Sequence, residues 1–170
     1  QLRTDQGDTE LVLVDLGGGR NRLGGSALAQ VHGQLGDAAP DLDAPAKLRA
    51  FFGAVQSLNA AGRILAYHDR SDGGLFATAC EMAFAGRAGV TLYLDGLAMD
   101  PAQLDVDGHE RQADILAGRL ADRILAVLFN EELGAVLQVR KGDRAAVMQA
   151  LRDAGLSRDS HVIGHPNADG

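Results

Sequence analysis

The sequence predicts an α+β fold, in which helices pack on a mixed β-sheet. Continuous apolar runs such as residues 11–16 are typical of buried strands, and apolar residues at helical spacing in residues 48–58 indicate an amphipathic helix. Glycines and prolines separate these segments. The 170 residues have the size of one domain and contain no repeat of fixed period.

The first half of the chain contains five expected elements. Residues 11–16 form a strand, residues 27–32 a short helix, and residues 48–58 a helix that Gly62 ends and whose Phe51 and Phe52 face the core. Residues 64–67 form a second strand. The helix that follows, residues 75–85, is apolar nearly all round, so we expect it to be buried and its Cys80 to be an inert core thiol.

The second half is expected to be richer in strands. Residues 89–94 form a strand, and residues 95–114, with scattered carboxylates and His109, form a solvated loop. Two apolar runs, residues 124–129 and 135–139, are predicted to be adjacent antiparallel strands joined by residues 130–134. A helix capped by Asp143 and ended by Gly155 follows, and residues 161–164 make the last strand.

Composition limits the classes of function. A formal net charge of −7 argues against a nucleic-acid surface, and no apolar segment is long enough to span a membrane. Cys80 is the single cysteine, which excludes an internal disulfide and fits a cytoplasmic protein. Because the chain begins with Gln1 and not with Met, we expect residues 1–170 to be a single domain excised from a larger multidomain protein.

The best candidate for chemistry lies between the strand at residues 64–67 and the helix at residues 75–85. Backbone N–H groups at a helix N-terminus favour phosphate. Asp69 can ligate a hard divalent cation, Ser71 can donate a hydrogen bond to phosphate, and Gly73 and Gly74 allow close approach of a ligand. This combination suggests a nucleotide with Mg²⁺. The alternative is that Ser71 and Asp72 only cap the helix.

A second candidate is the loop of residues 17–26, which is rich in glycine and arginine and precedes a helix. Such a loop can cradle an anion. It is neither a Walker A loop, because Gly25 stands at the lysine position, nor a dinucleotide fingerprint, because Arg22 stands at the third glycine. The alternative is a mobile connection that Ser26 caps and whose arginines are solvated.

Four blocks of sequence carry a resemblance to a known family. They are Arg-Asn-Arg-Leu-Gly-Gly-Ser within residues 15–30, Pro-Asp-Leu-Asp at residues 40–43, His-Asp-Arg-Ser-Asp-Gly-Gly-Leu within residues 68–86, and Phe-Asn-Glu-Glu-Leu-Gly-Ala-Val at residues 129–136. In this order, from Gly7 to Gly164, they resemble phosphoribosylformylglycinamidine synthase, the long single-chain enzyme of purine biosynthesis.

The resemblance implies that the chain is the second of two domains similar to the C-terminal domain of aminoimidazole ribonucleotide synthetase. The family's ligase, a glutamine amidotransferase, converts formylglycinamide ribonucleotide, ATP and glutamine-derived ammonia to the amidine. Here Asp69 is implied to be a Mg²⁺ ligand and Ser71 an ATP or ADP contact at an auxiliary site, with no catalytic residue.

The implied partners are the remaining domains of the same chain, which include the glutaminase, so the 170 residues alone are expected to be inactive. Two alternatives stay open. One is another ATP-dependent enzyme of the same superfamily. The other is a non-catalytic scaffold module whose nucleotide site is vestigial.

Overall fold

The computed structural model describes residues 1–98 and 113–168, with the side chains of residues 113–118 left aside. The strands are β1 (Thr9–Asp15), β2 (Ala66–Asp69), β3 (Gly89–Leu92), β4 (Gly134–Arg140) and β5 (Ser160–Asn167). The α-helices are α1 (Ala27–Val31), α2 (Pro45–Ala60), α3 (Gly74–Gly86), α4 (Asp95–Ala98), α5 (Ala113–Phe129) and α6 (Arg144–Asp153). Short 3₁₀ turns, Lys141–Asp143 and Ser157–Asp159, flank α6.

The five strands form one sheet in the order β2-β4-β1-β5-β3. Each of the four neighbouring pairs is antiparallel, so the described strands lack the mixture of directions that the sequence suggested. Strand β1 is central and pairs with β4 over its whole length, from Thr9 opposite Arg140 to Asp15 opposite Gly134. The predicted α+β class, a sheet with helices packed on it, is confirmed.

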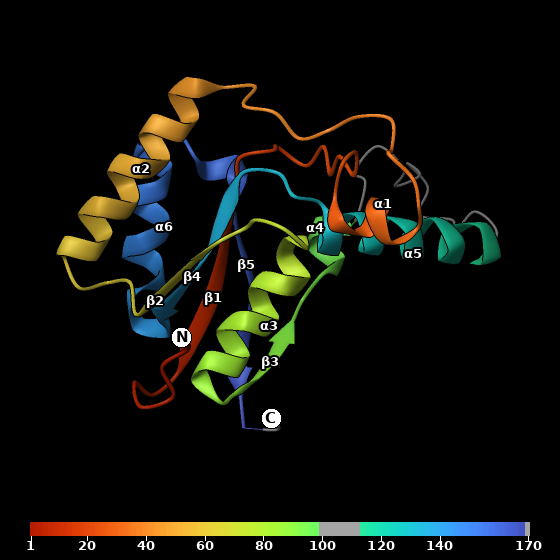
Figure 1. Ribbon diagram of the computed structural model, residues 1–170. Coiled ribbons are helices and arrows are strands. Elements are labelled where there is room, and N and C mark those ends of the chain that lie inside the picture. Colours follow the sequence, from red (N-terminus) through yellow and green to blue (C-terminus); the bar gives the residue numbers. More distant parts are fainter. Residues whose placement is uncertain (99–112, 169–170) are drawn as a thin grey trace.

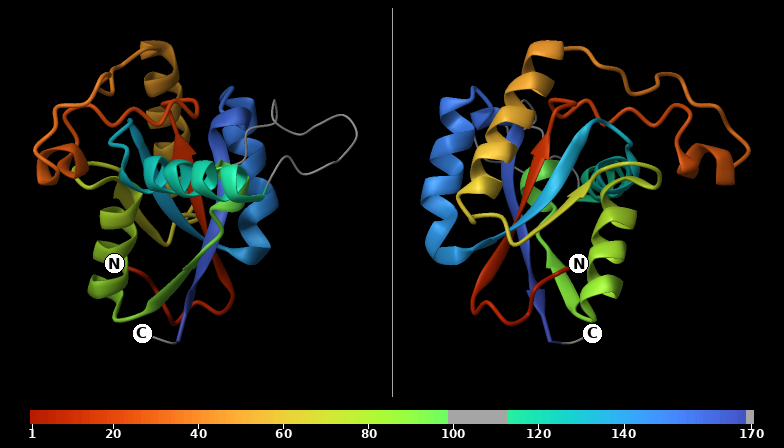
Figure 2. Two further views of the ribbon diagram at one scale, coloured as in Figure 1. Left: turned by 90° about the vertical axis from the view of Figure 1, so that its right-hand side faces the viewer. Right: turned by 60° about the vertical axis from the view of Figure 1, so that its left-hand side comes forward.

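Helices cover both faces of the sheet (Figures 1 and 2). Alternate residues of β1 point to opposite faces. Val12 and Val14 pack with α2 and α6, whereas Leu11 and Leu13 belong to the cluster that contains buried residues of α3 and α5. Because β1 is covered on both sides and paired at both edges, its run of apolar residues is needed along its whole length.

One predicted strand is wrong. Residues 124–129 are the last turns of helix α5 and do not pair with β4. A short apolar run fits a buried helix as well as a strand, so the run alone could not decide between them. Strand β4 instead pairs with β1 and β2.

The expectation that helix α3 is buried on all sides is also wrong. Phe84 is 78% exposed and Phe76 about half exposed, although the opposite face of α3 packs in the core. Cys80 is half-buried, not fully buried. On α2, Phe51 lies in the core as predicted, but its neighbour Phe52 is 64% exposed.

The remaining boundaries differ by small amounts. The strand expected at residues 64–67 occupies Ala66–Asp69, which places Asp69 at the end of β2. The expected loop at residues 95–114 contains α4 and the start of α5, while its residues 99–112, His109 among them, lie outside the described residues. Asp143 stands at the N-cap of α6, but its carboxylate pairs with Arg63 at 2.6 Å and does not cap the helix. In the described part of the chain, no helix is long and apolar enough to cross a membrane.

Candidate functional site

The junction between β2 and α3 exposes the two residues that the sequence singled out. The Asp69 side chain is 68% exposed, and Ser71 is exposed two residues further on. Beside them, His68 Nε2 lies 2.7 Å from Glu81 Oε2 and joins β2 to α3. Asp69 Oδ1 is 3.9 Å from His68 Nδ1, so its carboxylate has no close ion pair among the described residues. Both side chains are therefore accessible to a ligand.

The capping alternative is wrong for this helix. Neither Ser71 nor Asp72 caps α3, whose N-cap is Gly73 with a φ of +81°. The acceptor for the Gly73 N–H is Oε1 of Glu131, 2.8 Å away. The same oxygen accepts from the N–H of Ala27, also at 2.8 Å, so one carboxylate joins the starts of α1 and α3.

Gly74 brings the start of α3 against the end of α5. Its φ is +67°, and a Cβ at this position would lie 2.6 Å from the carbonyl oxygen of Asn130 and 2.7 Å from that of Leu128. No larger residue fits there without moving backbone, because real Cβ atoms do not approach so closely. Gly74 therefore does allow a close approach, but the group that approaches it is the backbone at the end of α5 and not a ligand.

The loop of residues 17–26 is ordered by carboxylates and is not a mobile connection with solvated arginines. Asp15 accepts from the N–H groups of Gly17 at 3.1 Å and Gly19 at 2.9 Å. Arg20 and Arg22 both bind Asp43, at 2.8 and 2.6 Å. As predicted, Ser26 caps α1, by accepting from the N–H of Ala29.

Arg22 also holds the buried Glu132 through two bonds, from Nε to Oε1 at 2.6 Å and from Nη2 to Oε2 at 2.8 Å. This fork geometry is the strong form of an arginine–carboxylate pair. The hydrogen bond to Glu132 is the main cause that raises the pKa of the Arg22 guanidinium, and the hydrogen bond from Arg22 lowers the pKa of Asp43. Arg22 is thus committed to protein carboxylates.

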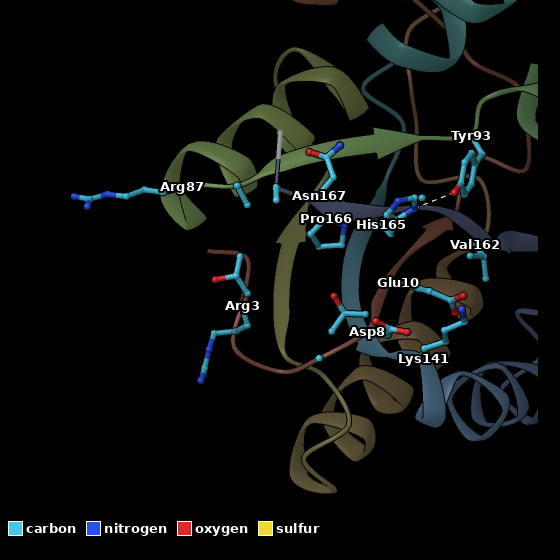
Figure 3. Close-up of a pocket in the computed structure, with 16 residues that line it drawn as sticks. Arg3, Asp8, Glu10, Arg87, Tyr93, Lys141, Val162, His165, Pro166 and Asn167 are labelled. Carbon is cyan, nitrogen blue, oxygen red and sulfur yellow. Dashed lines mark hydrogen bonds between the residues drawn. The ribbon is translucent and has the colours of Figure 1, made fainter. Parts of the chain in front are cut away.

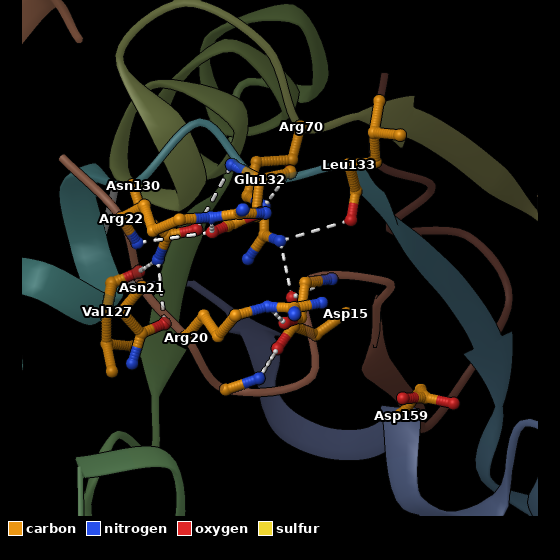
Figure 4. Close-up of polar contacts among 12 residues, drawn as sticks. Asp15, Arg20, Asn21, Arg22, Arg70, Val127, Asn130, Glu132, Leu133 and Asp159 are labelled. Carbon is orange, nitrogen blue, oxygen red and sulfur yellow. Dashed lines mark hydrogen bonds and ion pairs between the residues drawn. The ribbon is translucent and has the colours of Figure 1, made fainter. Parts of the chain in front are cut away.

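Arg70 is the residue of this region that the sequence analysis missed. In extended backbone, side chains alternate, so Arg70 points inward while Asp69 and Ser71 point out. Its side chain is 2% exposed; Nη2 binds Oδ1 of Asp15, and Nε donates to the carbonyl of Glu132 at 2.6 Å (Figure 4). A signal was present, because Asp15 and Glu132 are acidic residues at the ends of apolar runs, where a buried cation is the usual partner.

The junction offers the exposed carboxylate of Asp69 and the exposed hydroxyl of Ser71. Within the described residues no group of three or more His, Cys, Asp or Glu side chains is placed to hold a metal ion. Mg²⁺ in phosphate sites is commonly held by one or two carboxylates, waters and the phosphates themselves, so a single exposed carboxylate fits this ion. Asp69 is the residue that would hold it, and a bound Mg²⁺ would neutralise phosphate charge there.

A larger pocket, with a volume of about 900 Å³, lies at the other end of the sheet, where β1 begins and β5 ends. Arg3 and Arg87 line one end of it, and Asp8, Glu10 and Lys141 line the other (Figure 3). It contains neither Asp69 nor Ser71, and its charges are of both signs. Nothing in the sequence pointed to it.

The fold is similar to that of several solved structures. PurL of Thermotoga maritima complexed with ATP superposes with a TM-score of 0.60 at 13% identity, over 98% of this chain and 23% of that chain. PurL of T. maritima complexed with FGAR gives a TM-score of 0.61 at 13% identity, over 95% of this chain and 24% of that one. E. coli HypE, a hydrogenase maturation protein, gives 0.60 at 19% identity, over 97% and 45%.

The chain thus spans about a quarter of PurL and less than half of HypE. At these identities the similarity shows a common fold. The match to a sequence family is more extensive, because it covers residues 8–170 and so nearly the whole chain. By this match, the chain belongs to the family of the AIR synthase related protein, C-terminal domain.

Proposed function

We propose that this chain is a domain of phosphoribosylformylglycinamidine synthase, the ATP-dependent ligase and glutamine amidotransferase of cytoplasmic purine biosynthesis. Its role there is to help hold a Mg²⁺-nucleotide at an auxiliary site. The remaining domains of the same chain are its partners, and the 170 residues alone have no amidine-forming activity. PurL structures with ATP and ADP, whose fold this chain shares, support a nucleotide as the ligand.

The observation that carries the proposal is the exposed pair of Asp69 and Ser71 at the start of α3. Asp69 supplies a carboxylate oxygen to Mg²⁺, and Ser71 donates its hydroxyl to a phosphate oxygen. The Gly73 N–H at the start of α3 already donates to the Glu131 carboxylate, so the phosphate is held by Ser71 and by the Mg²⁺. Arg70 lies between the exposed pair and positions both residues from the buried side, because it binds Asp15 and the carbonyls of Glu132 and Leu133 and so fixes the end of β2.

A second candidate function is that of an interface module with a vestigial nucleotide site. The exposed aromatic side chains favour it, since Phe52 of α2 and Tyr67 of β2, 64% and 44% exposed, line the same surface pocket. Large exposed apolar side chains that cluster are typical of surfaces that meet other domains. The two functions are compatible, and only the nucleotide site predicts an effect of Asp69.

The test is ADP binding to the full-length protein that carries this domain, by calorimetry with Mg²⁺ and again with a chelator. Asp69→Asn is expected to weaken Mg²⁺-dependent binding by about 10- to 100-fold, the equivalent of one lost charge-assisted contact of roughly 1.5–3 kcal/mol. Binding without Mg²⁺ is unchanged. The matched control is Asp72→Asn, an exposed carboxylate of the same junction. Equal affinities for all three proteins would refute the metal role and leave the interface module.

A further inference from the structure

A small pocket lies behind the junction, on the inner side of Arg70. It has a volume of about 150 Å³ and is formed where β1 ends, where β5 begins and where the glycine-rich loop turns. Asp15, Gly18, Gly19, Arg70, Arg158 and His161 are among the residues that line it. A water molecule takes about 30 Å³ of liquid volume, so the pocket holds roughly five waters or one small polyatomic ion.

The floor of this pocket carries a buried guanidinium group with a free donor. Of the three nitrogens of Arg70, Nε and Nη2 bind Asp15 and the carbonyls of Glu132 and Leu133. No described residue accepts a hydrogen bond from Nη1, although the Arg70 side chain is only 2% exposed. Nη1 is not one of the fully buried polar atoms that lack a partner, so it keeps some accessible surface from which it can donate to a ligand.

The charges around the pocket favour an anion. Arg158 lines it, is exposed, and has no ion pair among the residues that the structure describes. The acidic group, Asp15, already accepts from Arg70 and from the N–H groups of Gly17 and Gly19, so both of its oxygens are engaged. The salt bridge with Arg70 compensates the negative charge of Asp15. The pocket therefore has a net positive charge, which comes from Arg158.

We propose that this pocket binds a phosphate group, either free or at the end of a phosphorylated small molecule, between Nη1 of Arg70 and the guanidinium of Arg158. Gly18 and Gly19 leave the wall free of side chains, since no atom lies within 4 Å of a Cβ built on either one. The volume excludes a whole nucleotide, because sites for ligands of that size occupy about 300–1,000 Å³.

This site is separate from the proposed Mg²⁺-nucleotide site. Asp69 and Ser71 lie on the exposed side of the chain and are absent from the lining of this pocket. Arg70 supports the first site through Nε and Nη2, which hold the end of β2, and it contacts a ligand only in this pocket, through Nη1. Neither proposal depends on the other.

The test is a titration of the 170-residue chain with inorganic phosphate and, separately, with AMP, followed by amide chemical shifts at constant ionic strength set with chloride. Saturable shifts of the Gly18, Gly19 and Gly96 amides are expected. Arg158→Gln is expected to raise the dissociation constant for phosphate about tenfold, because one charge-assisted contact is lost. The matched control Arg152→Gln changes an exposed arginine of α6 whose partner is Gln149, and leaves the constant unchanged.

The two ligands distinguish the sources of phosphate. Shifts with inorganic phosphate alone identify a free ion, and shifts with both ligands identify the end of a phosphorylated molecule. The absence of saturable shifts with either ligand overturns the proposal. Equal affinities of Arg158→Gln and the unchanged chain also overturn it, because the ion then lies outside this pocket.

Discussion

Replacing Arg70 with methionine tests whether one buried cation holds the end of β2 to the end of β1. The Arg70 side chain is 2% exposed and that of Asp15 9% exposed, so neither charge is solvated. The substitution removes three hydrogen bonds, to Asp15 and to the carbonyls of Glu132 and Leu133, and leaves the Asp15 carboxylate without its cation. Removing one partner of a buried pair usually costs about 3–5 kcal/mol.

We therefore expect Arg70→Met to lower the free energy of unfolding by about 3–5 kcal/mol. A domain of this size loses about 2–4 °C of Tm per kcal/mol, so Tm falls by roughly 6–20 °C. The assay is urea unfolding followed by far-ultraviolet circular dichroism, with Arg152→Met as the control. That residue is exposed on α6, so its loss is expected to change stability by about 0.5 kcal/mol or less.

A double-mutant cycle separates the ion pair from the carbonyl contacts. Asp15→Asn alone is expected to cost about 1–3 kcal/mol, and the double variant less than the sum by about 1–3 kcal/mol, because the second substitution no longer breaks the pair. A loss below about 1 kcal/mol for Arg70→Met would refute the reasoning, given the usual cost of such a pair. Additive losses would refute the direct coupling of the two side chains.

Two further predictions concern the loops. The hydrogen bond from Arg22 holds the pKa of Asp43 below its ordinary 3.8, so the contribution of Asp43 to stability is present at neutral pH and is lost as pH falls through the lowered value. A carboxyl ¹³C titration is expected to show the low pKa, and Arg22→Gln to return it toward 3.8; the same pKa in both proteins contradicts this. Gly74→Ala is expected to cost about 2 kcal/mol or more in urea unfolding, whereas the control Gly53→Ala, inside α2 with open space around it, is expected to stabilise by about 0.4–1 kcal/mol. Equal effects of these two substitutions would contradict the close approach at Gly74.

The sequence was sufficient to predict an element where its pattern of apolar residues had a single interpretation, either as a strand buried on both faces or as an amphipathic helix. Strand β1 and helix α2 were predicted at nearly their observed positions, because a paired central strand and a covered helix have unambiguous patterns. Residues 124–129 had two interpretations. Leu116, Leu120, Ile124 and Leu128 recur every four residues, which indicates a helix once the polar residues between them are accepted as its other face.

The exposed site residues were also accessible to sequence reasoning, but the residues that support them were not. Asp69 and Ser71 lie in a recognisable junction between a strand and a helix. The ion pairs of Asp15 with Arg70 and of Arg22 with Glu132 join residues that are 55 and 110 positions apart, and no local sequence pattern indicates contacts over such separations. Exposed aromatic residues were missed for a related reason, since composition does not tell which face of α3 is left uncovered.

The bonds between distant segments have a consequence for synthesis of the protein on the ribosome. Arg22 and Glu132 are 110 residues apart, and both neighbours of β1, strands β4 and β5, come after residue 133. At about 5–20 residues per second, β1 remains without its sheet partners for roughly 6–25 seconds after it is made. During this time its apolar run, Leu11 to Val14, is available to any other unpaired strand, so we expect chaperone binding to the nascent chain to persist until β4 has emerged.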